Sequence, residues 1–362
     1  MENQDLTPPD EEKVEDMWSS LPPDLLSLIP SNLYAGDNAM FRAVCKTWRS
    51  ITMAPPLPLP SPFDHADSLF PWLFHIPKSN NGRGKFFHPI SNYTCEIDLP
   101  AQLVGAVIHF SKYGWLLMAR HRVHPFLFNP LTKEIIELPE LPLDGIEYVR
   151  LMFFTSAPSP DCLVVVMNCR PQGHVWILKL GEGEWEFHYI VRENFDWTAC
   201  NPILHKGLYY SLDCDGNLGV FALEDIDNSW VTYEMKFPWS HFNSIVQAFL
   251  VENEGELLAI FIKKNGQKIH VFKLHPTRNI WEPVPSLGDN MLFVSPGASF
   301  SKKALVRGTR NKIYGPNFWD KNGLFCFYSL TTAKYHSFFD NLSSKDSYNT
   351  KFLQNCSWFI SM

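Results

Sequence analysis

Side chains that could carry out chemistry cluster at only a few places in this sequence. His121 and His124 are three residues apart on an expected hairpin loop without a nearby third ligand; we interpret them as solvated histidines, with metal binding as the alternative. Cys162 and Cys169 flank a strand and a turn, which is poor spacing for a metal site. Asp213-Cys-Asp-Gly-Asn217 is turn chemistry with too few ligands for calcium. We therefore expect no metal site and no cofactor.

Motifs of common enzyme classes are missing as well. The sequence contains no G-x-S-x-G, Walker A or H-E-x-x-H segment. Asn81-Gly-Arg-Gly-Lys85 is rich in glycine but lacks the strand–loop–helix setting of a phosphate-binding loop, so we interpret it as a hairpin turn. These observations predict a protein that is not an enzyme and has no catalytic residues.

The composition limits the classes of partner and compartment. The chain has 362 residues, of which 45% are hydrophobic, so two domains with a sizeable core are expected. Its net charge of -7 is spread along the chain, which argues against nucleic acid as the main partner. No apolar run is long enough to span a bilayer, and Met1–Glu15 lacks a secretory signal, which predicts no membrane partner and a cytoplasmic or nuclear location.

Residues 1–16 are expected to be disordered, and the expected helices and strands begin after them. Leu25, Leu28, Ile29 and Leu33 share one face of a short helix that begins near Leu21-Pro22 and should end or kink at Pro30. A second helix is expected after Gly36-Asp37. Its apolar stripe consists of Met40, Phe41, Val44, Cys45, Trp48 and Ile51. Helices this short need each other or a partner to be stable.

Residues 17–53 resemble an F-box, the helical module that docks on a Skp-type adaptor of a cullin ubiquitin ligase. The resemblance rests on Leu21-Pro22, Asp24-Leu25-Leu26 and Val44-Cys-Lys-Thr-Trp-Arg49. It implies that Trp48 holds the helices together and that the following residues face the adaptor: Leu21, Pro22, Leu25, Leu26, Ile29, Leu33, Val44 and Cys45. Pro30 departs from the family pattern and bears on the strength of adaptor binding. The alternative is a plain helical hairpin packed on the rest of the chain.

Residues 54–68 form the expected linker. The run Ala54-Pro-Pro-Leu-Pro-Leu-Pro-Ser-Pro62 favours a semi-rigid polyproline II spacer. A ligand for a proline-binding domain is the alternative.

Residues 69–362 are predicted to form an all-β propeller. Short runs of Val, Ile, Phe, Tyr and Trp alternate with turn residues, and similar closing strands recur at intervals of 39 to 54 residues. The recurring positions are Ile97, Ile136, Trp185, Trp230, Trp281 and Tyr335. Four strands per repeat predict six blades, with seven as the alternative. The C-terminal strand Ser357-Trp-Phe-Ile-Ser361 should complete the first blade as its innermost strand, which removes an open sheet edge.

Several phrases in this region resemble plant F-box proteins whose C-terminal domain is a KIB-type β-propeller. They are Tyr113-Gly-Trp-Leu-Leu-Met118, Phe128-Asn-Pro-Leu-Thr132, residues 205–218 and residues 281–289. The resemblance implies the substrate-recognition subunit of an SCF-type (Skp–cullin–F-box) E3 ubiquitin ligase, in which the propeller binds an unknown target protein. The alternatives are a propeller enzyme with residues from several blades in its central channel, and a non-degradative scaffold with a degenerate F-box.

Loops between the second and third strands of the blades should emerge on one face. They carry basic residues, which we hypothesise attract acidic or phosphorylated target segments. The alternative is that these charges are simply solvated. The candidates for this target-binding face are Arg120, Arg122, Arg170, Lys263 and Lys264.

Overall fold

The computed structural model describes two compact units, Met1–Ser61 and Pro62–Met362. The described residues are 21–29, 41–42, 44–51, 70–77, 82–89, 93–142, 149–155, 157–168, 173–190, 195, 200–213, 215–236, 245–263, 268–306, 308–319, 325–337, 344–345 and 355–360. Within these ranges, residues 245–246, 263, 316–319, 325, 337 and 344–345 are described by their backbone only. The predicted disordered segment 1–16 and linker 54–68 lie outside the described residues.

Among its described residues, the first unit shows the short helices α2 (Pro23–Leu28) and α4 (Lys46–Ser50). Proline in the first turn of α2 has no amide hydrogen to leave unpaired, and Asp24 places a negative charge there. The helix ends at Leu28, before Pro30, as predicted. The prediction of one continuous second helix was wrong, because the chain is extended at Cys45. Cys45 is extended, with φ -155° and ψ 173°, and its Sγ accepts a hydrogen bond from the Trp48 amide at 3.4 Å, so α4 begins only at Lys46.

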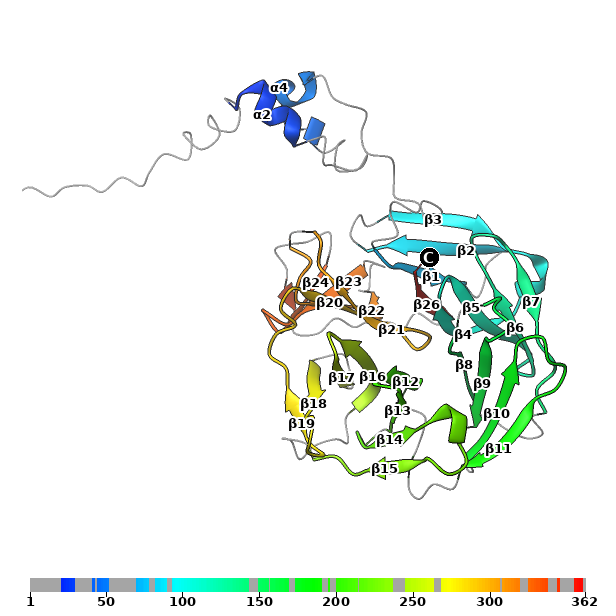
Figure 1. The fold of residues 1–362 in the computed structure, drawn as a ribbon. Helices are drawn as coiled ribbons and strands as arrows, with labels where there is room; N and C mark the ends of the chain where they lie inside the picture. Colours follow the sequence, from blue (N-terminus) through cyan, green and yellow to red (C-terminus); the bar gives the residue numbers. More distant parts are fainter. Residues whose placement is uncertain are drawn as a thin grey trace, which may run out of the picture. The chain divides into compact units, whose positions relative to one another are not determined.

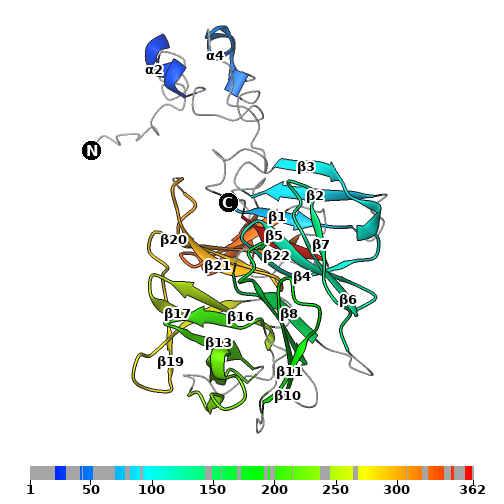
Figure 2. The same cartoon turned by 45° about the vertical axis from the view of Figure 1, so that its right-hand side comes forward.

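The second unit is a six-bladed propeller whose sheets surround a common centre (Figures 1 and 2). From the innermost strand outward, the first blade contains β26 (Cys356–Phe359), β1 (Trp72–His75), β2 (Arg83–His88) and β3 (Tyr93–Asp98). The second contains β4 (Val107–Lys112), β5 (Trp115–Arg120), β6 (His124–Phe128) and β7 (Ile135–Glu137). The third contains β8 (Val149–Phe153), β9 (Leu163–Asn168), β10 (Gly173–Lys179) and β11 (Glu186–Ile190).

The remaining blades continue the ring in chain order. The fourth contains β12 (Ile203–His205), β13 (Leu208–Leu212), β14 (Leu218–Phe221) and β15 (Val231–Tyr233). The fifth contains β16 (Ile245–Asn253), β17 (Glu256–Lys263), β18 (Ile269–Leu274) and β19 (Trp281–Pro283). The sixth runs in the order β21 (Ser299–Lys303), β20 (Asn290–Val294), β22 (Lys312–Trp319), β23 (Phe325–Ser329), β24 (Lys334–Ser337) and β25 (Ser344–Lys345).

The C-terminal strand closes the ring, as the sequence predicted. β26 pairs antiparallel with β1, in a register that places Phe359 opposite Trp72 and Cys356 opposite His75. The first blade is therefore built from both ends of the propeller sequence, and β1 has no unpaired inner edge.

The sixth blade departs from the predicted four strands. It contains a β20–β21 hairpin inside the expected strands, and β20 pairs with β22 in parallel, with Met291 opposite Lys312. The longest interval of the repeat, from Trp281 to Tyr335, encloses this hairpin. The extra residues of this interval therefore form an additional inner strand, β21, rather than a longer loop. On the outer side, β25 pairs with β24 as a second additional strand.

The hydrophobic core lies between neighbouring blades. Each of the buried apolar clusters joins two adjacent sheets; one, for example, contains Leu116 of the second blade and Phe86 of the first. Trp281 and Trp358 have exposed fractions of 0% and belong to the clusters between blades four and five and between blades six and one. Because the large side chains are buried between blades, the ring is stabilised as a whole.

Candidate functional site

The helical unit exposes apolar side chains that its own core does not use. Leu26 and Phe41 are buried, and Phe41 stacks on Trp48 with ring centroids 4.6 Å apart. By contrast, Leu25, Leu28 and Val44 have exposed fractions of 55%, 60% and 61%. Such side chains favour burial against a partner, since removing apolar surface from water is favourable.

The structure separates the residues expected to face the adaptor by their exposure. Leu25, Val44 and Pro22 are exposed, whereas Leu26 is buried within the unit. Leu21, Ile29 and Cys45 are half-buried, and Leu33 lies outside the described residues. Leu28 was not in the predicted set, although its place on the apolar face of the first helix was visible in the sequence.

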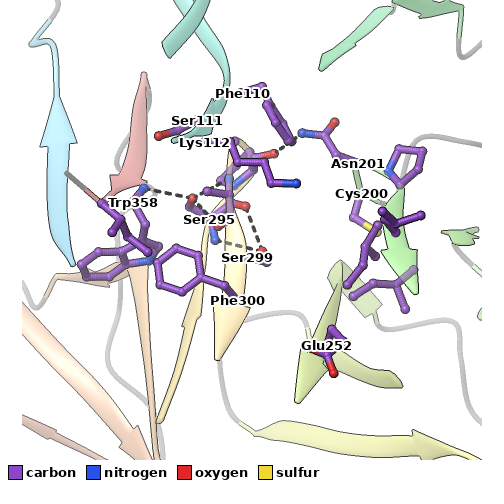
Figure 3. Close-up of a pocket in the computed structure, with 18 of the residues that line it drawn as sticks. Phe110, Ser111, Lys112, Cys200, Asn201, Glu252, Ser295, Ser299, Phe300 and Trp358 are labelled. Carbon is purple, nitrogen blue, oxygen red and sulfur yellow. Dashed lines mark hydrogen bonds between the residues drawn. The ribbon is translucent and has the colours of Figure 1, made fainter. Parts of the chain in front are cut away.

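In the propeller, a cavity of about 420 Å³ lies at the centre of the ring (Figure 3). Every blade contributes to its wall. One residue from each blade is Trp358 of β26, Lys112 of β4, Phe154 after β8, Asn201 before β12, Glu252 of β16 and Ser299 of β21. None of them was a candidate from the sequence, because residues from six repeats meet only when the ring closes.

One wall of the cavity is formed by Ser295–Ala298, the turn between β20 and β21, which we call the axial turn. Asn201 of the fourth blade donates from Nδ2 to the Pro296 carbonyl at 3.0 Å, and the Ser111 amide of the second blade donates to the Gly297 carbonyl at 3.0 Å. The Trp358 amide of the first blade donates to Ser295 Oγ at 3.3 Å. The axial turn therefore links the sixth blade to three others.

Gly297 is needed for this approach. A Cβ atom built on Gly297 would lie 2.6 Å from Ser357 Oγ and 3.0 Å from Ser357 Cβ. A larger residue would therefore push the axial turn away from β26, since packed interiors have little room to yield.

The second blade has a β-bulge near the axial turn, beside Asn201. The β4–β5 register shifts between Ile108 and Phe110, which leaves His109 without a partner in the ladder. The His109 carbonyl accepts a hydrogen bond from Asn201 Nδ2 at 3.4 Å. Burial, together with the positive charge of Arg150, lowers the pKa of His109 to about 4, so its imidazole is neutral at physiological pH.

Lys112 provides a positive charge inside this aromatic cavity. Its side chain extends into the cavity in Figure 3, and its Nζ lies 4.8 Å from the centroid of the Tyr113 ring. Among the residues that the structure describes, none supplies a carboxylate that forms an ion pair with Lys112. Glu252 also lines the cavity, but its Oε1 accepts the Gly255 amide at 2.6 Å in the β16–β17 turn.

The predicted basic face is described only in part. Arg120 forms an ion pair with Glu137, and its guanidinium lies 4.8 Å from the Phe126 ring centroid, so its charge is already engaged. Arg122 is exposed in the β5–β6 turn, at φ 68°. Arg170 and Lys264 lie outside the described residues, as does the side chain of Lys263.

The structure describes several of the other side chains considered for chemistry. His121 and His124 contact each other edge-on, with ring centroids 6.4 Å apart. Asp213 accepts the Asn217 amide at 2.7 Å and Asn217 Nδ2 at 2.9 Å, which closes a turn, and burial raises the pKa of its carboxyl. In the described part of the chain, no three His, Cys, Asp or Glu side chains gather to hold a metal ion.

None of the described helices is long and apolar enough to cross a membrane.

Comparison with known proteins identifies both units. Residues 18–58 match the F-box domain family, and residues 86–329 match the KIB1-4 beta-propeller family. An F-box/kelch-repeat protein of Arabidopsis thaliana is 30% identical over 89% of this chain and 89% of its own length. The F-box protein KIB4 of the same plant is 24% identical over 89% of this chain and 90% of its own length. The chain therefore belongs to the F-box proteins that carry a KIB1-4 beta-propeller.

Proposed function

We propose that this protein is the substrate-recognition subunit of an SCF-type E3 ubiquitin ligase, acting in the cytoplasm or nucleus. Its F-box docks on a Skp-type adaptor, and through it on a cullin, while the propeller holds a target protein. The observation that carries the proposal is the exposure of Leu25, Leu28 and Val44 in a unit that matches the F-box family.

In this role the protein does no bond chemistry itself. Tethering a target beside the ubiquitin-loaded enzyme raises the effective concentration of its lysines, and that positional effect is the whole contribution of the receptor. The propeller suits the task because its blades form a rigid scaffold on which surface loops can vary.

The proposal is tested by co-purifying the full chain with a Skp-type adaptor and a cullin. Leu25→Ala/Val44→Ala removes exposed apolar surface, so each substitution should weaken capture by about 1 kcal/mol or more without unfolding the unit. The matched control is Lys46→Ala/Thr47→Ala, which changes exposed polar positions beside the same motif. Leu21→Ala/Pro22→Ala provides an independent variant at the start of the motif.

Capture by the wild type and the control, but not by the apolar variants, is the expected result. Failure of the wild type to bind any Skp-type adaptor would contradict the proposal. If the adaptor binds but a captured target is neither ubiquitylated with the assembled complex nor stabilised when the protein is lost, a non-degradative scaffold is the better description.

A further inference from the structure

We propose that the central cavity of the propeller binds a small organic anion with an aromatic or otherwise apolar body, through Lys112 and the surrounding aromatic rings. This inference goes beyond the ligase role and does not depend on it, because it concerns binding by the propeller alone.

The cavity has the size and place of a ligand site. Its volume of about 420 Å³ falls in the range of roughly 300–1,000 Å³ that small-molecule pockets occupy. It lies on the axis of the ring, where all six blades contribute residues. The axial turn, which is hydrogen-bonded to three other blades, holds one wall in place before any ligand arrives. A preformed wall lowers the entropic cost of binding.

The walls favour an apolar body. Phe110, Tyr113, Phe154 and Phe300 line the cavity and are only half-buried, so part of each ring is left uncovered by the blade-to-blade core. Trp358 also lines the cavity and is fully buried. A ligand ring in contact with these side chains would be stabilised, because aromatic pairs contribute free energy beyond that of the area they bury. An apolar chain would be favoured by the burial of apolar surface.

The charge at the centre favours an anion. The ammonium of Lys112 extends into the cavity, where its described contact is with the ring of Tyr113. A carboxylate there would form a charge-assisted hydrogen bond in a place partly shielded from water. Inorganic phosphate would leave the aromatic walls unused. Glu252 also lines the cavity, but its Oε1 already accepts the Gly255 amide in the β16–β17 turn, whereas the ammonium of Lys112 has a ring as its described contact. The combination therefore selects an apolar body that ends in a carboxylate.

The experiment uses the full-length chain and three matched probes: 3-phenylpropionate, 3-phenylpropanamide and 3-phenylpropylamine. Naphthalene-2-carboxylate and its amide provide a larger ring system. Binding is followed by saturation-transfer difference NMR and quantified by titration. We expect affinity in the millimolar range for ligands of this size, at least tenfold weaker binding of each amide than of its acid, and no binding of the amine.

Two substitutions locate the site. Lys112→Met keeps the length and apolar stem of the side chain, and should reduce affinity for the acids to that of the amides. Lys179→Met is the matched control, because Lys179 is exposed at the end of β10 and outside the cavity; it should leave binding unchanged. Lys112→Arg should retain a preference for the acids.

Three results would overturn the inference: no saturation transfer to any acid, equal affinity for acid and amide in the wild type, or undiminished acid binding by folded Lys112→Met. If Lys112→Met does not fold, the acid-to-amide ratio of the wild type decides the question. Adaptor capture by the same variants separates this inference from the proposed function, since loss of ligand binding should leave capture intact.

Discussion

Asn355 and Ile108, which are 247 residues apart in the sequence, are joined by a hydrogen bond of 2.7 Å from the Ile108 amide to Asn355 Oδ1. The Nδ2 of Asn355 donates in turn to the Ala106 carbonyl at 2.9 Å. One side chain before the last strand therefore mimics a short stretch of β-ladder between the first and second blades. Asn355 adopts φ 56°, a left-handed conformation that asparagine tolerates better than most residues.

Substitution of Asn355 should therefore weaken the closed ring. Asn355→Gly keeps the left-handed backbone but removes both hydrogen bonds, and should lower the free energy of unfolding by about 1–3 kcal/mol. Asn355→Ala should cost more, because a Cβ without the amide also makes the left-handed backbone unfavourable. Urea denaturation measures both variants. Equal stability of the wild type and Asn355→Gly would show that these bonds do not contribute to closure.

Removal of residues 356–362 should open the propeller. β26 would be lost, and with it Trp358 and Phe359, both with exposed fractions of 0%. The inner edge of β1 would then be unpaired, and we expect the chain to aggregate in size-exclusion chromatography. Deletion of Ser361 and Met362 alone leaves the strand intact and is the control. A monomeric truncated chain with the melting temperature of the wild type would contradict the assigned closure.

Gly297→Ala should destabilise the propeller, because the new methyl group would overlap Ser357 Oγ at 2.6 Å. A cost of about 1–3 kcal/mol is expected for such overpacking. Gly183→Ala is the matched control, since a Cβ at Gly183 meets nothing within 4 Å. Chemical denaturation of both variants tests whether the axial turn is fixed in place. Similar unfolding curves for Gly297→Ala and Gly183→Ala would mean that the turn moves to accommodate the methyl group.

In the F-box, buried and exposed leucines should behave differently. Leu26→Ala removes a side chain with an exposed fraction of 1%, and should destabilise the helical unit by about 2–5 kcal/mol. Leu25→Ala should leave the unit folded, because Leu25 is 55% exposed. Hydrogen exchange followed by mass spectrometry over residues 21–51 measures both. Equal protection in the two variants would contradict the assignment of Leu26 to the core.

Buried histidines should make the propeller less stable in acid. Burial lowers the pKa of His88 from 6.5 to about 4, so the folded state binds fewer protons than the unfolded state between these values. Stability should therefore be fully present above pH 6.5 and fall as the pH drops towards 4. His88→Phe keeps an aromatic ring near Trp72, whose centroid lies 4.8 Å from that of His88, and should reduce this slope. Part of the pH dependence should remain in this variant, because the pKa of His75 is also lowered to about 4. An unchanged slope in His88→Phe would assign the pH dependence to other groups.

The sequence by itself determined the fold class and the family, because both depend on local patterns. Alternating strands, turn residues and recurring closing strands from Ile97 to Tyr335 predicted the six blades, and the spare strand around Trp358 predicted the closure. The F-box phrases are contiguous, so Leu21-Pro22 and Val44–Arg49 were enough to assign the motif. The break at Cys45 was missed because its cause is a side-chain cap, which competes with the apolar periodicity.

The tertiary structure alone decided where the inner surfaces meet. The extra β20–β21 hairpin has the same local pattern as any other strand pair, and only its parallel pairing with β22 places it on the axis. Lys112 and Glu252 belong to separate blades and line one cavity because the ring closes through β26. Propeller blades repeat along the sequence, but their innermost strands come together at a single point in space, so a site on the axis leaves no spacing that a sequence can show.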